Sequence, residues 1–203
     1  MEFQDVVRRR RMVRSFEPEP VPRDTLERIL ENALHAPSAG FTQGYAFLVL
    51  EGAEETVRFW DATFPDPAQR ARFRYPRLFD APVIVVPLSS ENAYVERYAE
   101  PDKGVTDRRA SFWPVPYWHI DAGFATMLML LTAVDTGLGA LFFGIFPEHL
   151  DAFRAAFAVP DDMTPIGAVA LGVPARDDPP SPSLRRGRKP LEAVVHRGMW
   201  GRT

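Results

Sequence analysis

The residues from 118 to 136 place the strongest constraint on how this chain can fold. They form a helical pattern that is apolar on nearly every side, with apolar residues at Ile120, Ala122, Phe124, Met127, Leu128, Leu130, Leu131 and Val134. A helix of this kind is normally buried on most of its sides. We therefore expect a central helix with other elements packed around it. Because the helix is more apolar than one chain of 203 residues needs, we also expect a homodimer.

Helical patterns and single short apolar runs alternate along the rest of the chain. The spacing of one buried helix face is seen at Leu26, Ile29, Leu30, Ala33 and Leu34. Further helices are predicted at 2–11, 54–63, 67–79 and 147–157, and strands at 45–50, 82–86, 140–145 and 165–172. Four of the five residues at 82–86 are β-branched, which is typical of a buried strand. This order predicts a layered α+β or α/β domain over residues 1–203, with helices packed on a central sheet.

Composition excludes several classes of function. The formal net charge of -3 argues against nucleic acid as the main partner, because binding a phosphate backbone requires a basic face. The chain has no cysteine, which excludes disulfides, thiolate chemistry and sulfur-ligated metals. Its four histidines show no metal-ligand spacing, so no metal site is expected. Neither a signal peptide nor a membrane span is evident, and we expect a cytoplasmic protein with no membrane partner.

Two basic clusters lie near opposite ends of the chain. The first spans residues 8–14 and the second residues 185–189. A solvated basic surface would account for either cluster alone. We favour one anion held from both sides, because the first cluster closes a short helix and its apolar neighbours limit how far the arginines can spread. Arginine suits phosphate because its planar guanidinium forms bidentate, charge-assisted hydrogen bonds.

An ordered set of short motifs resembles the FMN-dependent nitroreductase family. The motifs are Arg-Arg-Met-Val-Arg-Ser-Phe at 10–16, Pro-Val-Pro at 20–22, Ala-Pro-Ser-Ala-Gly at 36–40, Gly-Leu-Gly at 137–139, Ala-Leu-Gly-Val-Pro at 170–174 and Arg-Gly-Arg-Lys-Pro-Leu at 186–191. They cover nearly the whole chain in the family's order. The resemblance implies a homodimer of three-layer α/β/α chains, each with a mostly antiparallel central sheet.

The same resemblance assigns the two basic clusters to FMN. It implies that the phosphate and ribityl chain contact Arg10, Arg11, Met12 and Arg14 from the first cluster, and Arg186 and Arg188 from the second. Met12 stands where the family usually has serine, so only its backbone would serve as a donor.

The remaining implied contacts are to the flavin ring. The ring would lie against Pro37, Ser38 and Ala39, a segment that often comes from the other subunit in relatives. Phe41 would form one side of the ring site, at a position where the family usually has asparagine. Arg77 would reach its pyrimidine end, although a plain surface arginine explains this residue equally well. Phe143 and Gly144 would pass its edge, with the Gly144 backbone near N5; a buried strand with a bulge glycine is equally compatible with this sequence.

The stretch from 89 to 118 is expected to be an irregular loop rich in aromatic residues, either a substrate lid or a contact with the dimer partner, and we favour the lid. The tail at 174–203 is expected to dock on another surface. By resemblance, the chain passes electrons from NADH or NADPH through FMN to an electron-poor acceptor such as a nitroaromatic or a quinone, in a ping-pong cycle. Because this chemistry takes place at flavin N5, no protein side chain is assigned as catalytic. The alternatives are an oxidative, dehydrogenating flavoenzyme of the same family and a flavin-binding protein that stores or senses the cofactor.

Overall fold

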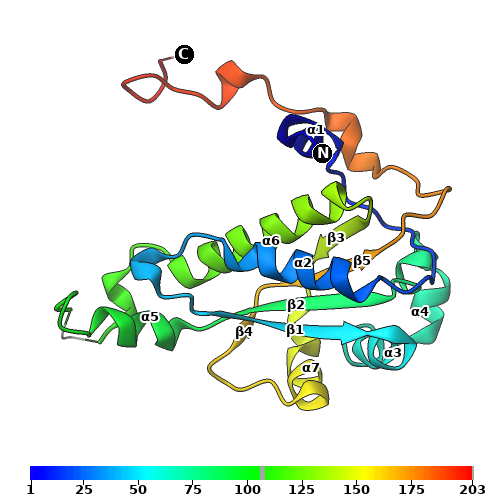
Figure 1. The fold of residues 1–203 in the computed structure, drawn as a ribbon, viewed down its shortest axis with the longest axis horizontal. Coiled ribbons are helices and arrows are strands. Elements are labelled where there is room, and N and C mark those ends of the chain that lie inside the picture. The colour runs from blue at the N-terminus through cyan, green and yellow to red at the C-terminus, as the bar shows by residue number, and fades with distance from the viewer. Residues whose placement is uncertain (106–107, 203) are drawn as a thin grey trace.

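The computed structural model describes residues 1–105 and 108–202 and is built around a five-stranded sheet (Figure 1). The strands are β1 (Tyr45–Glu51), β2 (Val83–Ser89), β3 (Gly139–Phe143), β4 (Thr164–Pro165) and β5 (Ala168–Gly172). Their order is β1-β2-β5-β3, and the short β4 pairs with β2. All of these pairs are antiparallel, which confirms the mostly antiparallel sheet that the family resemblance implied.

Helices cover both faces of this sheet (Figure 1). The α-helices of the described residues are α1 (Phe3–Arg9), α2 (Arg23–Leu34), α3 (Gly52–Thr63), α4 (Pro67–Ala71), α5 (Glu91–Tyr98), α6 (Tyr117–Asp135) and α7 (Leu150–Phe157). Helices α2 and α6 pack together on one face, and α3 and α7 pack together on the other. The three-layer arrangement that the family resemblance implied is therefore confirmed.

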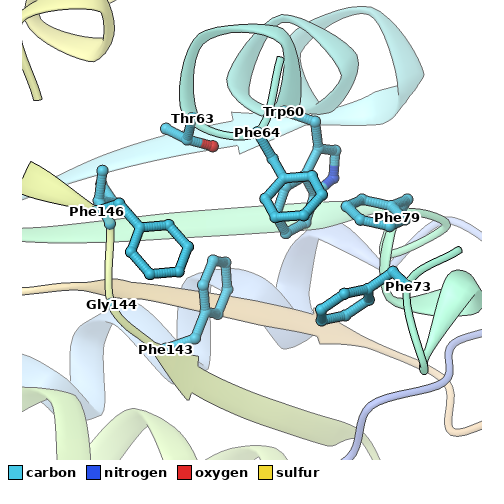
Figure 2. A pocket seen from close by; sticks show the side chains of 9 residues that line it. Trp60, Thr63, Phe64, Phe73, Phe79, Phe143, Gly144 and Phe146 are labelled. Carbon is cyan, nitrogen blue, oxygen red and sulfur yellow. The ribbon is translucent and has the colours of Figure 1, made fainter. Parts of the chain in front are cut away.

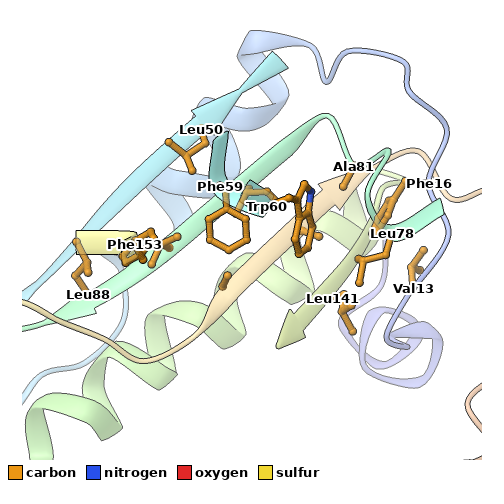
Figure 3. Packing of buried hydrophobic residues seen from close by; sticks show 14 of the residues in the cluster. Val13, Phe16, Leu50, Phe59, Trp60, Leu78, Ala81, Leu88, Leu141 and Phe153 are labelled. Carbon is orange, nitrogen blue, oxygen red and sulfur yellow. The ribbon is translucent and has the colours of Figure 1, made fainter. Parts of the chain in front are cut away.

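Side chains of the strands alternate between two apolar cores, as the period of two in a β-strand requires. In β2, Val83 and Val85 point toward α2 and α6, whereas Ile84 and Val86 point toward α3 and α7. Figure 3 shows the second core, in which Phe59 and Trp60 of α3 lie over the strands. Both faces of β2 are buried along its whole length, which explains why its sequence is almost continuously apolar.

The expected irregular loop at 89–118 begins instead with a helix. The hydroxyl of Ser90 accepts a hydrogen bond from the Ala93 amide at 3.2 Å and caps α5. Tyr94 anchors this helix because its ring is fully buried. The predicted helix at 67–79 is also shorter than expected: α4 ends at Ala71, and a separate 3₁₀ turn begins at Pro76. Residues 106 and 107 of the expected lid lie outside the described residues.

Helix α6 is buried on one side and leaves an apolar stripe on the other. Ala122, Ala125 and Met129 are fully buried, but Ile120, Phe124 and Met127 are 37%, 47% and 46% exposed. The expectation that this helix is covered on most sides is therefore only partly met within one chain. No helix in the described part of the chain combines the length and apolar character needed to cross a bilayer. The cytoplasmic location stays a prediction.

Both ends of the chain run beside the edge of the sheet formed by β3. Met12 forms a parallel bridge with Ala140 of β3, and the Val13 amide donates to the Ala140 carbonyl at 3.0 Å. Phe16 bridges Pro174, which follows β5. These contacts place the N-terminal basic cluster alongside β3 and bring the start of the C-terminal tail next to it.

Candidate functional site

Arg10 occupies the turn between α1 and the segment that runs along β3. It is the C-cap residue of α1, and its amide donates to the Val6 carbonyl at 2.9 Å. Its Nη1 atom is buried and has no hydrogen-bond partner among the described residues. A buried guanidinium nitrogen without an acceptor is energetically costly, so this position is suited to an anionic ligand.

The next two arginines are held by one carboxylate of the C-terminal tail. Arg11 forms an ion pair with Asp178, and the same side chain accepts a hydrogen bond from the Arg14 amide at 2.8 Å. The Arg14 guanidinium donates to the Met12 carbonyl at 3.0 Å and lies 5.5 Å from the centre of the Tyr75 ring. Asp178 was not recognised in the sequence, yet it joins the N-terminal cluster to the tail.

Arg77 lies among carboxylates. Its guanidinium contacts Glu17 at 2.5 Å, Asp177 at 3.1 Å and Asp80 at 3.8 Å. Hydrogen bonding to Glu17 is the main reason that the pKa of Arg77 is raised. These ion pairs fasten the N-terminal and C-terminal segments together, which agrees with the surface interpretation of Arg77. A contact with the ring stays a prediction.

Arg186 and Arg188 lie in the part of the tail that follows Asp178. Arg186 ends the 3₁₀ turn Pro182–Arg186, and Gly187 with a φ of 68° separates it from Arg188. Both arginines are exposed. The tail contacts therefore bring this cluster toward the N-terminal one, but convergence of Arg186 and Arg188 with Arg10 on one ligand stays a prediction.

The predicted ring-facing segment at 37–41 lies at another part of the molecule, beside α5 (Figure 1). Its Ala39 amide donates to Oδ2 of Asp121 in α6 at 2.8 Å, and Arg97 of α5 donates to the Gly40 carbonyl at 3.1 Å. Ser38 accepts from the Gln43 amide at 3.0 Å. Pro37 is exposed. Within one chain this segment lies away from α1, so the structure does not bring it together with Arg10.

Phe41 projects from this segment into solvent. Its side chain is 77% exposed and its φ is 54°, a left-handed conformation that is uncommon for a bulky residue. Strained and exposed apolar residues of this kind cluster at ligand sites and interfaces. The predicted contact of Phe41 with the flavin ring would therefore have to form with a ligand or surface outside this chain.

Phe143 and Gly144 lie at the far end of β3 and line a cavity of about 350 Å³ (Figure 2). The cavity is formed by side chains from α3, the turn before β2 and the end of β3, and its lining residues are Trp60, Thr63, Phe64, Phe73, Phe79, Phe143, Gly144, Ile145 and Phe146. A Cβ atom placed on Gly144 would meet no atom within 4 Å. A ligand could therefore approach the backbone of Gly144 closely.

Comparison with known proteins identifies the family of the chain. The sequence model described as "Nitroreductase family" matches residues 7–173. A protein of Thermus thermophilus named NADH dehydrogenase is 29% identical over 208 residues, which cover 92% of this chain and 91% of that protein. The family match at 7–173 includes the N-terminal basic cluster and all five strands of the sheet.

Solved structures show the same fold. A putative nitroreductase of Desulfovibrio desulfuricans, crystallised in complex with FMN, has a TM-score of 0.67 and 26% identity, with 96% of this chain and 95% of that chain covered. The NfrA2 protein of B. megaterium has a TM-score of 0.74 at 20% identity, covering 98% of this chain and 75% of that one.

Proposed function

The chain belongs to the nitroreductase family, and from this premise we propose that it is an FMN-dependent oxidoreductase that passes electrons from NADH or NADPH to an electron-poor acceptor such as a nitroaromatic or a quinone. The observation that carries the proposal is the buried Nη1 atom of Arg10, which has no partner among the described residues. The FMN complex of the relative from Desulfovibrio desulfuricans supports FMN as the flavin.

The residues present fit the phosphate of FMN. Arg10 would hold it by a charge-assisted hydrogen bond, and Arg186 and Arg188 would approach from the tail. Asp178 already engages the Arg11 guanidinium and the Arg14 backbone amide, so we propose that this part of the cluster also holds the tail in place. The Arg14 guanidinium donates to the Met12 carbonyl instead. Met12 adds no polar side chain, and its amide and carbonyl lie beside β3.

Beyond the phosphate, the residues at the end of β3 would orient the ring. Phe143 lies three positions after Ala140, which pairs with Met12, a span of roughly 10 Å along a strand. A mononucleotide lying along β3 would therefore place its ring beside Gly144. FMN, when bound, supplies two-electron chemistry that lets a reduced nicotinamide and an acceptor react in turn at one exposed face.

The site is proposed to be completed by a second copy of the chain. Pro37, Ser38, Ala39 and Phe41 lie away from α1 in one chain (Figure 1), so they can join Arg10 only from a partner subunit. The exposed apolar stripe of α6 offers a surface for that partner. The apolar tail residues Leu191 and Trp200, 68% and 86% exposed, offer a second one.

The absorption spectrum of the purified protein tests this proposal first, followed by identification of the chromophore that heat releases. Steady-state oxidation of NADH and NADPH is then measured with 1,4-naphthoquinone as the acceptor. A bound FMN together with acceptor-dependent oxidation is the expected result. FMN without turnover would indicate storage of the cofactor, and a colourless protein that does not bind added FMN would refute the proposal.

A further inference from the structure

Four arginines lie in the stretch 70–77, and two of them are neutralised by carboxylates. Arg70 donates to Oδ1 of Asp61 at 2.7 Å and to the Phe64 carbonyl at 2.6 Å. Arg77 has the three carboxylate partners described above. These contacts fasten α4 to the end of α3 and to the two ends of the chain, and they occupy the charged donors of Arg70 and Arg77.

The other two arginines of this stretch have only neutral partners. Arg72 donates to the Ala68 carbonyl at 3.1 Å, and the Arg74 guanidinium lies 5.7 Å from the centre of the Tyr75 ring. Both side chains are exposed, and neither forms an ion pair with a carboxylate in the described part of the chain. Their remaining guanidinium donors are therefore available to an anion from solution.

The Tyr75 ring also has a second guanidinium against it. Arg14 lies 5.5 Å from the centre of this ring and donates to the Met12 carbonyl at 3.0 Å, so its side chain too has neutral partners. A cation–π contact orients a guanidinium over a ring without cancelling its charge. We call Arg14, Arg72 and Arg74 the arginine rim.

Carboxylates on the neighbouring elements do not occupy the rim. Asp66 accepts the amides of Ala68 and Gln69 at 2.8 Å and 3.3 Å and thereby caps α4. Glu148, in the turn before α7, lines a hollow together with His149. The rim is therefore distinguished by charged donors that no carboxylate engages, rather than by the net charge of the surface around it.

The rim borders the cavity beside Gly144. Phe73 stands between Arg72 and Arg74 and lines that cavity (Figure 2), whereas the two arginines on either side of it are exposed. Under the proposed function the flavin ring lies beside Gly144. A nicotinamide that reached this ring would leave the remainder of its dinucleotide outside the cavity, on the surface that carries the rim.

NADPH differs from NADH by a single phosphate on the adenosine ribose. A phosphomonoester carries a charge of about −1.5 to −2 at pH 7. The planar guanidinium of arginine matches the geometry of such a group and binds it by two parallel hydrogen bonds. NADH shares the diphosphate of NADPH but has no second phosphate, so arginines that bind the extra group discriminate between the two donors.

We propose that Arg72 and Arg74 bind the 2′-phosphate of NADPH, with Arg14 beside them, and that the chain therefore uses NADPH in preference to NADH. The inference rests on the proposed function, because the dinucleotide is the electron donor of that reaction. It goes further by naming which donor is preferred and which residues select it.

The test removes the two exposed guanidiniums and compares the result with a matched control. The double variant Arg72→Gln with Arg74→Gln is measured beside Arg28→Gln, which changes an exposed arginine of α2. Arg14 stays unchanged because it belongs to the cluster assigned to FMN. Calorimetry on the flavin-loaded protein measures the Kd of adenosine 2′,5′-bisphosphate and of AMP, two probes that differ only by the 2′-phosphate. Turnover with 1,4-naphthoquinone gives the KM of NADPH and of NADH.

We expect the unmodified protein to have a KM for NADPH at least about tenfold below that for NADH, and the same order of preference for the bisphosphate over AMP. The double variant should raise the KM of NADPH and the Kd of the bisphosphate by roughly tenfold, while the values for NADH and AMP and the flavin content stay the same. Arg28→Gln should change none of them. The preference should also shrink with added salt, because the Debye length falls from about 30 Å at 0.01 M to about 3 Å at 1 M.

Three results would overturn the inference. Equal KM values for NADPH and NADH in the unmodified protein would show that the 2′-phosphate is not recognised. A double variant that weakens both donors equally would assign the rim to the shared diphosphate, and one that loses flavin would assign it to FMN.

The failure of the proposed function gives a different result. An unmodified protein that binds no flavin refutes that function, and calorimetry with the two adenosine nucleotides then decides about the rim alone. A preference for the bisphosphate that the double variant abolishes supports the phosphate site, and equal binding of the two nucleotides overturns it. If the flavin-loaded protein oxidises NADH and NADPH equally well, the proposed function stands and only this inference fails.

Discussion

The phenol of Tyr94 donates a 2.6 Å hydrogen bond to Oδ2 of Asp121, and the same oxygen accepts the Ala39 amide at 2.8 Å. This carboxylate is 3% exposed. It therefore links α5, α6 and the segment at 37–41 through one atom. The pKa of Tyr94 is raised mainly by burial and, to a smaller extent, by the hydrogen bond to Asp121. The phenol therefore stays protonated and keeps donating at any ordinary pH.

Removing the Tyr94 hydroxyl should loosen the segment that carries Ala39. Tyr94→Phe is expected to lower the free energy of unfolding by about 1.5–3 kcal/mol, the range for a hydrogen bond to a charged group. The Ala39 amide should also exchange its hydrogen faster, because Asp121 loses the second donor that orients it. Urea unfolding and hydrogen exchange measure these two effects.

A control on the same helix distinguishes this link from a general loss of packing. Thr126 is also buried in α6, but its hydroxyl donates only to the Ala122 carbonyl within the helix, at 2.7 Å. Thr126→Val should leave exchange at Ala39 unchanged. Faster exchange at Ala39 in both variants would mean that α6 itself is destabilised and that the link to Asp121 has no special part.

The proposed phosphate contact of Arg10 can be tested against its neighbour. Arg10→Ala should weaken FMN binding by about ten- to a hundredfold, because one charge-assisted hydrogen bond contributes about 1.5–3 kcal/mol. Arg188→Ala should act in the same direction if the tail supplies the second half of the site. Arg9→Ala removes the same charge from an exposed position at the end of α1 and should leave affinity nearly unchanged. Fluorescence titration with FMN measures all three, and equal affinities would contradict the assignment.

Regular elements could be predicted from the sequence where local pattern and burial agree. The β-branched run was correctly predicted as the buried strand β2, and the apolar spacing at 26–34 as one buried face of α2. Both sides of β2 and one side of α2 pack against apolar neighbours. Helix α5 was missed because only Tyr94 of its eight residues is buried, which leaves no periodic apolar face. Ser90 before Glu91 was the available signal, since serine is a favoured N-cap.

The contacts that assemble the candidate site join residues far apart in the sequence, and the sequence pattern predicts such contacts poorly. Asp178 meets the Arg14 amide across a separation of 164 residues, and no spacing rule predicts such a pair. Asp121 did leave a signal: it lies inside a mostly apolar helix whose other carboxylate, Asp135, is the last residue, and a buried charge requires partners. The resemblance supplied the residues predicted to lie near FMN, and under the proposed function those at 37–41 would reach the ligand only from a second subunit.

The exposed stripe of α6 predicts how a dimer can be separated. Phe124→Glu should shift the protein toward the monomer, because a charge in an apolar contact loses its hydration. Val57→Glu places the same charge at a similarly exposed apolar residue of α3, on the opposite face, and should not change the mass. Sedimentation velocity gives the mass of each variant. A monomeric unmodified protein, or a dimeric Phe124→Glu variant, would contradict this interface.

Two glycines with nearly the same backbone conformation test how closely α5 packs on the segment at 37–41. Gly40 and Gly104 have φ values of 63° and 68°, so alanine strains the backbone similarly at both, by roughly 1–2 kcal/mol. A Cβ on Gly40 would lie 2.8 Å from the Tyr98 ring, whereas one on Gly104 would meet nothing within 4 Å. Gly40→Ala should therefore lower the midpoint of urea unfolding more than Gly104→Ala. Equal midpoints would show that Tyr98 moves aside freely.

His119 predicts a loss of stability in mild acid. Its Nδ1 atom lies 2.8 Å from the hydroxyl of the buried Ser89, and burial lowers its pKa, with Glu91 opposing the shift more weakly. The unfolded chain therefore binds a proton at a higher pH than the folded chain does. The free energy of unfolding should fall as the pH decreases from about 6.5 toward the folded pKa, by no more than about 1.4 kcal/mol per pH unit for one proton. His119→Asn keeps a polar atom near Ser89 but cannot titrate, so it should lack this part of the slope when urea unfolding is measured between about pH 5 and pH 7.5. Parallel pH profiles for both proteins would mean that the proton binds equally to the folded and unfolded chains.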